Sequence, residues 1–323
     1  MAPLLALLAS VALPAPSLAD TWEYTPPRCE PGRAASESPL ECHAPTFRVV
    51  DAQRTYNRIG TPELRRGRLF GVRARVDPER PSLFVEQRSD RVAGRDVVQL
   101  VYRIHFEKIP LRFSRYFFEA HRNPGLMVVL TQDAATRQLL FVSTVHTCGC
   151  YFVVVPTDAV DPDWLPEGWT SEQVLYGQRL PGTLPAAEVA RGVTVALESQ
   201  SHRVTGIEVG GAGEGRSMPI ELVPMARLEA LPIEGRAGET ASFFYEAGPL
   251  RGHVRGAWNP MEGLTVFGWI SLDPTVGMDK QFGDPERTGT PFYTLLPFWL
   301  HQRSRLDRFD SLLRALDFRL PEE

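Results

Sequence analysis

The sequence predicts a mainly β protein, with α+β as the alternative class: two strand-rich lobes, each sandwich-like or barrel-like, and one amphipathic helix at the C-terminus. Three observations predict this class. Runs rich in β-branched and aromatic residues recur along the chain, glycine and proline separate them, and helical periodicity is clear only in residues 306–316. Of the 323 residues, 43% are hydrophobic and 23% are charged, which is typical of a globular chain rather than a disordered one.

The first segment, residues 1–19, has the pattern of a secretory signal peptide. It contains no charged side chain, and an apolar run from Leu4 to Leu13 is followed by two prolines and the small residues that end at Ala19. A transmembrane helix needs about 20 apolar residues, and no stretch of the chain reaches that length. We therefore expect an exported protein, periplasmic or secreted, with no transmembrane span after cleavage.

The second segment, residues 20–46, is an extension rich in proline that carries Cys29 and Cys42. An exported chain with four cysteines favours disulfide bonds. Three pairings are open: 29–42 with 148–150, 29–148 with 42–150, and 29–150 with 42–148. The two crossed pairings would attach the extension to the strand that contains Cys148 and Cys150.

The first lobe is predicted over residues 47–157. Its strands are rich in valine, isoleucine, leucine and aromatic residues, and residues 133–136 form the loop of a hairpin. Prolines and a glycine between residues 156 and 168 mark its end. The predicted strands are 69–76, 83–87, 97–106, 126–131 and 139–155.

The second lobe is predicted over residues 158–323, with strands at 193–197, 202–209, 242–246 and 264–272. Near the C-terminus, apolar residues recur at spacings of three and four, which predicts a helix with one apolar face. These residues are Leu306, Phe309, Leu312, Leu313 and Leu316. We expect this helix to dock on a sheet; the alternative is peripheral contact with a membrane surface.

The most informative motif is His146-Thr-Cys148-Gly-Cys150. In an extended strand, residues two apart project from the same face, so the three side chains are expected in one row, and Gly149 allows a bend that brings the thiols together. Thiolate and imidazole ligands suit copper or zinc, and His43 is a candidate fourth ligand. The leading hypothesis is an envelope protein that binds a soft metal, copper before zinc.

Two other classes of function remain open. The first is a structural or interaction protein of the envelope, in which two disulfides only stabilise the fold. The second is an enzyme, either a thiol-redox enzyme that uses Cys148 and Cys150 or a hydrolytic enzyme.

A separate ligand pocket is predicted where carboxylates follow an aromatic strand, at Trp269, Asp273 and Asp279. Nucleic acid is excluded as a partner, because the net charge is −4 and the basic residues do not cluster.

Overall fold

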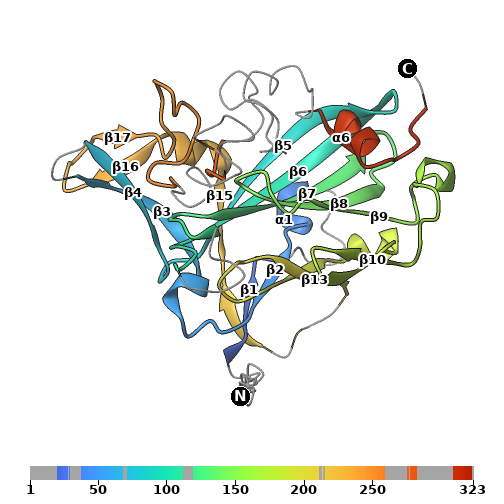
Figure 1. Cartoon of the computed structure of the whole chain (residues 1–323), viewed down its shortest axis with the longest axis horizontal. Helices are drawn as coiled ribbons and strands as arrows, with labels where there is room; N and C mark the ends of the chain where they lie inside the picture. Colours follow the sequence, from blue (N-terminus) through green and yellow to red (C-terminus); the bar gives the residue numbers. More distant parts are fainter. Residues whose placement is uncertain are drawn as a thin grey trace, which may run out of the picture.

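The structure is a computed structural model that describes residues 20–27, 29, 38–67, 71–111, 119–210, 213, 215–258, 275, 277–281 and 308–321. It confirms the mainly β prediction: the described chain forms two large sheets, a small hairpin and few helices (Figure 1), and neither sheet closes into a barrel within the described part. The predicted signal peptide, the predicted strand 264–272 and the candidate pocket residues Trp269 and Asp273 lie outside the described residues.

The larger sheet has ten strands and is built around a long central strand, β6 (Arg95–Phe106), which pairs antiparallel with β5 (Ser82–Val92) and β7 (Gly125–Asp133). Residues 100–106 of β6 are buried on both faces of the strand, as expected for a central position in the sheet. The other strands are β3 (Ile59–Arg66), β4 (Val72–Asp77), β8 (Leu139–His146), β9 (Val153–Pro156), β15 (Glu221–Pro224), β16 (Leu231–Glu234) and β17 (Thr240–Ala241).

The smaller sheet has five strands and crosses below the larger one in Figure 1. Its order is β13 (Val204–Val209), β12 (Val193–Leu197), β2 (Thr46–Val49), β1 (Trp22–Thr25) and β14 (Arg216–Pro219). β2 pairs in parallel with β12, and β15 pairs in parallel with β5. The predicted boundary at residue 157 therefore does not separate the sheets, because each sheet contains strands from both halves of the chain.

The remaining elements are short. Strands β10 (Glu172–Leu175) and β11 (Gln178–Pro181) form a hairpin of their own. The helices of the described residues are α1 (Pro39–Cys42), α2 (Ala186–Val189) and α6 (Phe309–Ala315), and short 3-10 helices occupy residues 55–57, 162–164 and 225–229.

The main hydrophobic core lies between the two sheets. Phe47 and Val49 of β2 pack in one cluster with Tyr102 and Ile104 of β6, and all four side chains are buried. The opposite face of the five-stranded sheet carries ion pairs, for example Arg48 with Glu23 (2.9 Å). The alternation of apolar and polar residues thus sets which face of β2 is buried.

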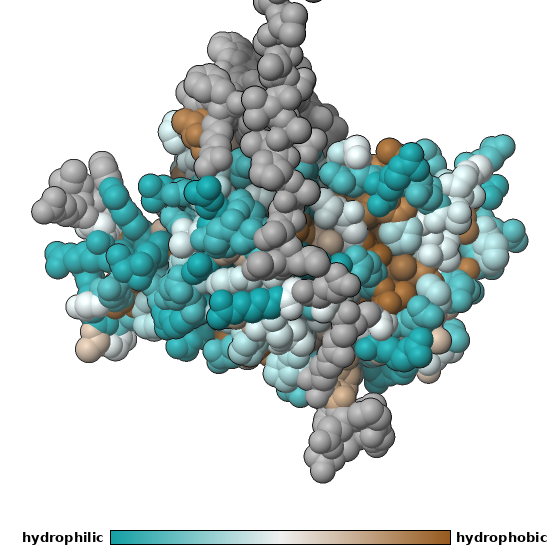
Figure 2. Space-filling view, turned by 90° about the horizontal axis from the view of Figure 1, so that it is seen from below, coloured by the Kyte–Doolittle hydropathy of each residue, from teal (hydrophilic) through white to brown (hydrophobic). Residues whose placement is uncertain are grey.

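Seen from below, much of the described surface is hydrophilic, with hydrophobic residues gathered toward the right (Figure 2).

The predicted C-terminal helix is present as α6, and its apolar face packs on the large sheet. Phe309, Leu312 and Leu313 are buried in a cluster with Phe141 of β8 and with Trp164. The membrane-surface alternative is wrong for these residues, because the protein itself already covers their side chains. No helix among the described residues combines the length and the apolar character that a membrane crossing requires.

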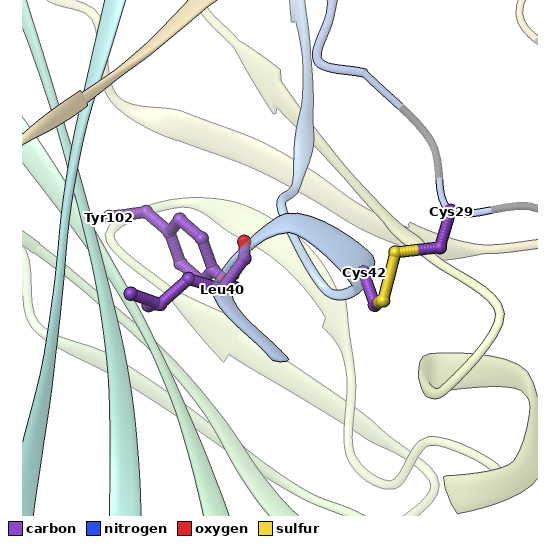
Figure 3. The surroundings of a disulfide bond; sticks show 4 residues. All are labelled: Cys29, Leu40, Cys42 and Tyr102. Carbon is purple, nitrogen blue, oxygen red and sulfur yellow. Dashed lines mark hydrogen bonds between the residues drawn. A yellow bond between two sulfur atoms is a disulfide. The ribbon is translucent and has the colours of Figure 1, made fainter. Parts of the chain in front are cut away.

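One disulfide joins Cys29 to Cys42, at a Cα–Cα distance of 5.0 Å, whereas Cys148 and Cys150 are not bonded to another cysteine. Both crossed pairings are therefore wrong, and so is the expectation of two structural disulfides. The extension is held instead by α1: the Tyr102 hydroxyl donates to the Leu40 carbonyl oxygen (3.0 Å), next to the disulfide (Figure 3). A local cross-link and one partly buried helical turn hold the described residues of this segment.

Candidate functional site

The His-x-Cys-x-Cys motif does not form one continuous strand. Strand β8 ends at His146, and the chain turns back so that the His146 amide donates to the Cys150 carbonyl oxygen (3.0 Å) and the Gly149 amide donates to the His146 carbonyl oxygen (2.7 Å). Gly149 has a φ of 90°, a conformation that favours glycine. The prediction of a strand over residues 139–155, with three ligands in a row, is therefore wrong.

The turn nevertheless brings the two cysteines together. The Cys150 amide donates to the Cys148 sulfur at 3.4 Å. Cys148 is buried, whereas Cys150 is partly exposed. The bend expected at Gly149 is thus present, but it belongs to a tight turn at the end of β8 rather than to a bulge within a strand.

His146 is buried beside this turn, and its orientation is fixed. Its Nε2 lies 3.1 Å from the carbonyl oxygen of His202, which can only accept, so Nε2 carries the proton. Burial lowers the pKa of His146, which keeps the ring neutral at neutral pH. Nδ1 therefore holds the lone pair, the arrangement found in histidines whose second nitrogen binds a metal or accepts a proton.

His202 is the second buried neutral imidazole of the site. Its Nε2 lies 2.9 Å from the Tyr56 carbonyl oxygen, and its ring stacks on Phe106 with centroids 3.8 Å apart. Its Nδ1 is buried and has no hydrogen-bond partner in the described part of the chain. Burial, with a further contribution from His146, lowers the pKa of His202 to about 3.

A polar triad packs against the turn. The Tyr151 hydroxyl donates to Glu119 Oε1 (2.5 Å), and Arg203 Nη2 donates to the same carboxylate and to the tyrosine oxygen. The Arg203 guanidinium also lies 4.0 Å above the Tyr151 ring. Burial raises the pKa of Tyr151, so it remains a hydrogen-bond donor.

The Asp279 carboxylate links three segments at this end of the sheet by hydrogen bonds. It accepts from the Gly125 amide (3.0 Å), from the Thr147 hydroxyl and from His121 Nε2 (2.5 Å). His121 Nδ1 faces the Glu119 carbonyl oxygen (2.6 Å), so both ring nitrogens meet acceptors and the ring is an imidazolium. Burial alone would raise the pKa of Asp279, but the charge of His121 and these hydrogen bonds hold it below its usual value.

The predicted site residues thus have different surroundings. His146, Cys148 and Cys150 share one turn, whereas His43 follows α1 next to the disulfide, where burial lowers its pKa. Asp279 is 1% exposed and accepts hydrogen bonds from Gly125, Thr147 and His121. Among the described residues, no group of three or more His, Cys, Asp or Glu side chains is arranged to hold a metal ion.

Local sequence patterns did not single out Glu119, Tyr151 or Arg203. They come from positions that no local spacing connects, since the contact between Arg203 and Glu119 spans 84 residues. Of these residues, only Tyr151 lies next to the motif in the sequence, because it directly follows Cys150.

The buried neutral histidines predict acid sensitivity. In the unfolded chain, His146 and His202 have a pKa of about 6.5, so below that pH the unfolded state binds more protons than the fold does. Their contribution to stability is complete above pH 6.5 and is lost as the pH falls toward the folded pKa, about 3 for His202. For each pH unit of acidification below 6.5, each histidine should lower the free energy of unfolding by up to about 1.4 kcal/mol.

Urea denaturation between pH 7.5 and pH 4.5 checks this expectation. The matched variant is His202→Asn, since asparagine tolerates the positive φ of 57° at this position but does not titrate. Its stability should depend less steeply on pH than that of the unaltered protein. An equal pH dependence of the free energy of unfolding in the two proteins would show that His202 does not contribute to acid sensitivity.

The fold and the site define a mainly β protein in which two sheets stack and a cluster of polar side chains lies beside a turn that carries two cysteines. Comparison with protein-family models, with curated proteins and with solved structures finds no match to this chain.

Proposed function

We propose that this chain is an exported protein, periplasmic or secreted, that binds Cu(I) between Cys148 and Cys150. The observation that carries the proposal is the pair of cysteines, unbonded to each other, on one tight turn at the end of β8. Thiolates are soft ligands and select Cu(I), which is stable with two sulfur ligands, whereas structural zinc takes four.

The surroundings of the turn support this assignment. His146, buried beside the turn, is neutral and donates from Nε2 to the His202 carbonyl oxygen, so it adds no positive charge beside a bound cation. The rings of Tyr151 and Tyr176 meet edge to face with centroids 5.0 Å apart, and Tyr151 directly follows Cys150 in the turn. Aromatic walls around a thiolate pair limit the access of water and oxidants to a bound ion.

Export is supported by two independent features. The apolar first 19 residues predict a signal peptide, and the Cys29–Cys42 disulfide is typical of oxidising compartments. In such a compartment, two adjacent thiols are prone to oxidation. A bound soft metal ion keeps them from forming a disulfide.

The test is an anaerobic Cu(I) titration of protein purified from the periplasm without reductant, in competition with a chromophoric Cu(I) chelator. We expect about one equivalent of bound copper, and we expect its loss in the double variant Cys148→Ser/Cys150→Ser. The matched control is Cys29→Ser/Cys42→Ser, which also removes two cysteines but leaves the turn intact and should still bind copper.

Two results would contradict the proposal. The first is binding of less than a tenth of an equivalent by the unaltered protein, with peptide mapping showing a Cys148–Cys150 disulfide; this would favour a thiol-redox function instead. The second is equal copper binding by both double variants, which would place the metal elsewhere.

A further inference from the structure

A cavity of about 150 Å³ lies on the face of the large sheet opposite the main core. Its floor comes from β5, β6 and β7, which run side by side in Figure 1. Its walls include Met127, Met225 and Phe244, and Arg88, Arg103 and Gln281 bring polar groups to it. The thiol turn contributes no residue to it, so this inference is independent of the proposed function.

Arg103 is the unusual residue of this cavity, because its buried guanidinium forms no ion pair with a carboxylate among the described residues. Its side chain projects from β6 and is only 2% exposed. Its Nε donates to His105 Nε2 (2.8 Å) and its Nη1 to the Lys280 carbonyl oxygen (3.1 Å), both of them uncharged acceptors. Its Nη2 is buried and has no hydrogen-bond partner in the described structure.

The guanidinium remains charged under physiological conditions. Burial lowers the pKa of Arg103 to about 10, which is still well above neutral pH. The nearby Asp279 carboxylate is already bonded to three donors, including the charged His121. A buried charge that no neighbour pairs is costly to the fold, and an anionic ligand would compensate it.

The other charged groups of the cavity have polar partners of their own. Arg88 forms an ion pair with Glu86, and Gln281 Nε2 donates to Glu229 (2.6 Å). Among the described lining residues, Arg103 is therefore the one cation for which no ion pair is present. A dianion such as phosphate would place a second negative charge near Glu86 and Glu229, which disfavours it.

We propose that this cavity binds a small monocarboxylate with an apolar body. One carboxylate oxygen accepts from Arg103 Nη2, and the apolar part packs on the two methionines and on Phe244, whose ring already lies 5.2 Å from the guanidinium. A cavity of about 150 Å³ is large enough for a benzene ring, so benzoate is a suitable probe.

The test measures the melting temperature of the full chain with benzoate, with benzamide as its uncharged analogue, and with inorganic phosphate. Benzoate at about 100 times its Kd should raise the melting temperature by about 5 °C, and benzamide should not. Arg103→Met should abolish this shift. Arg179→Gln, which removes an exposed arginine on β11, is the matched control and should keep it.

Arg103→Met should fold, because it replaces an unpaired buried charge with an apolar side chain of similar length. If it does not, Met225→Trp decides the question: it keeps Arg103 but fills the cavity, and it should abolish the benzoate shift. No benzoate shift in the unaltered protein, an unchanged shift in Arg103→Met or Met225→Trp, or a larger shift with phosphate would overturn the proposal.

Discussion

Replacing Asp279 with alanine is expected to lower the free energy of unfolding by about 3–5 kcal/mol. This carboxylate is 1% exposed and accepts hydrogen bonds from three separate segments, through Gly125, Thr147 and His121. Its removal leaves a buried imidazolium without its counter-charge and two buried donors without an acceptor. Urea denaturation at pH 7 measures the loss.

The control for this variant is Asp96→Ala. Asp96 also pairs with an arginine, Arg91, but its side chain is 81% exposed, so its loss should change stability by no more than about 0.5 kcal/mol. The variants Asp279→Ala and His121→Ala should also be non-additive, with a coupling of about 0.5–3 kcal/mol in a double-mutant cycle. A loss as small as that of Asp96→Ala would contradict the role of Asp279 as the link between these segments.

Replacing Phe141 with alanine is expected to cost about 3–5 kcal/mol and to loosen helix α6. The Phe141 ring is fully buried on β8 and meets the rings of Phe309 and Phe318 edge to face, with centroids 5.6 and 6.0 Å apart. The substitution removes both aromatic contacts and leaves a cavity beneath the helix. Urea denaturation and limited proteolysis near residue 308 measure the two effects.

Phe309→Ala should reproduce both effects from the helix side, since its ring is the partner of Phe141. Val174→Ala is the control, because this large apolar side chain is 66% exposed on the β10–β11 hairpin and should cost little. If Phe309→Ala left stability unchanged, α6 would not be docked in solution, and the membrane-surface alternative would need to be reconsidered.

The fold class and the central strands of the large sheet could be predicted from local patterns. Alternating or continuous apolar runs predicted the strands that became β5, β6, β7 and β12, and Asp133 closes the predicted hairpin loop by accepting from the Ala135 and Thr136 amides. The helix near the C-terminus followed from spacings of three and four. These strands, the hairpin loop and the helix depend on residues that are close in the sequence, so local patterns are sufficient to predict them.

The thiol motif shows where local patterns fail. β-Branched residues on both sides of it favoured one strand from 139 to 155, but β8 ends at His146 and β9 begins at Val153. The turn between them forms because Gly149 and Tyr151 adopt positive φ values and because the sheet supplies a partner, Gly125, for the Thr147 amide. The hydrophobic periodicity of the sequence does not reveal a hydrogen-bond partner that lies 22 residues away.

Alternation along β6 by itself determined that Arg103 and His105 share one face and that Tyr102 and Ile104 share the other. Only the tertiary structure decided that the polar face is buried as well. Phe243, Phe244 and the backbone of Lys280 pack over it, from more than 130 residues further along the chain. The backbone geometry of a strand sets the direction of a side chain, but its solvation depends on which distant segments cover it.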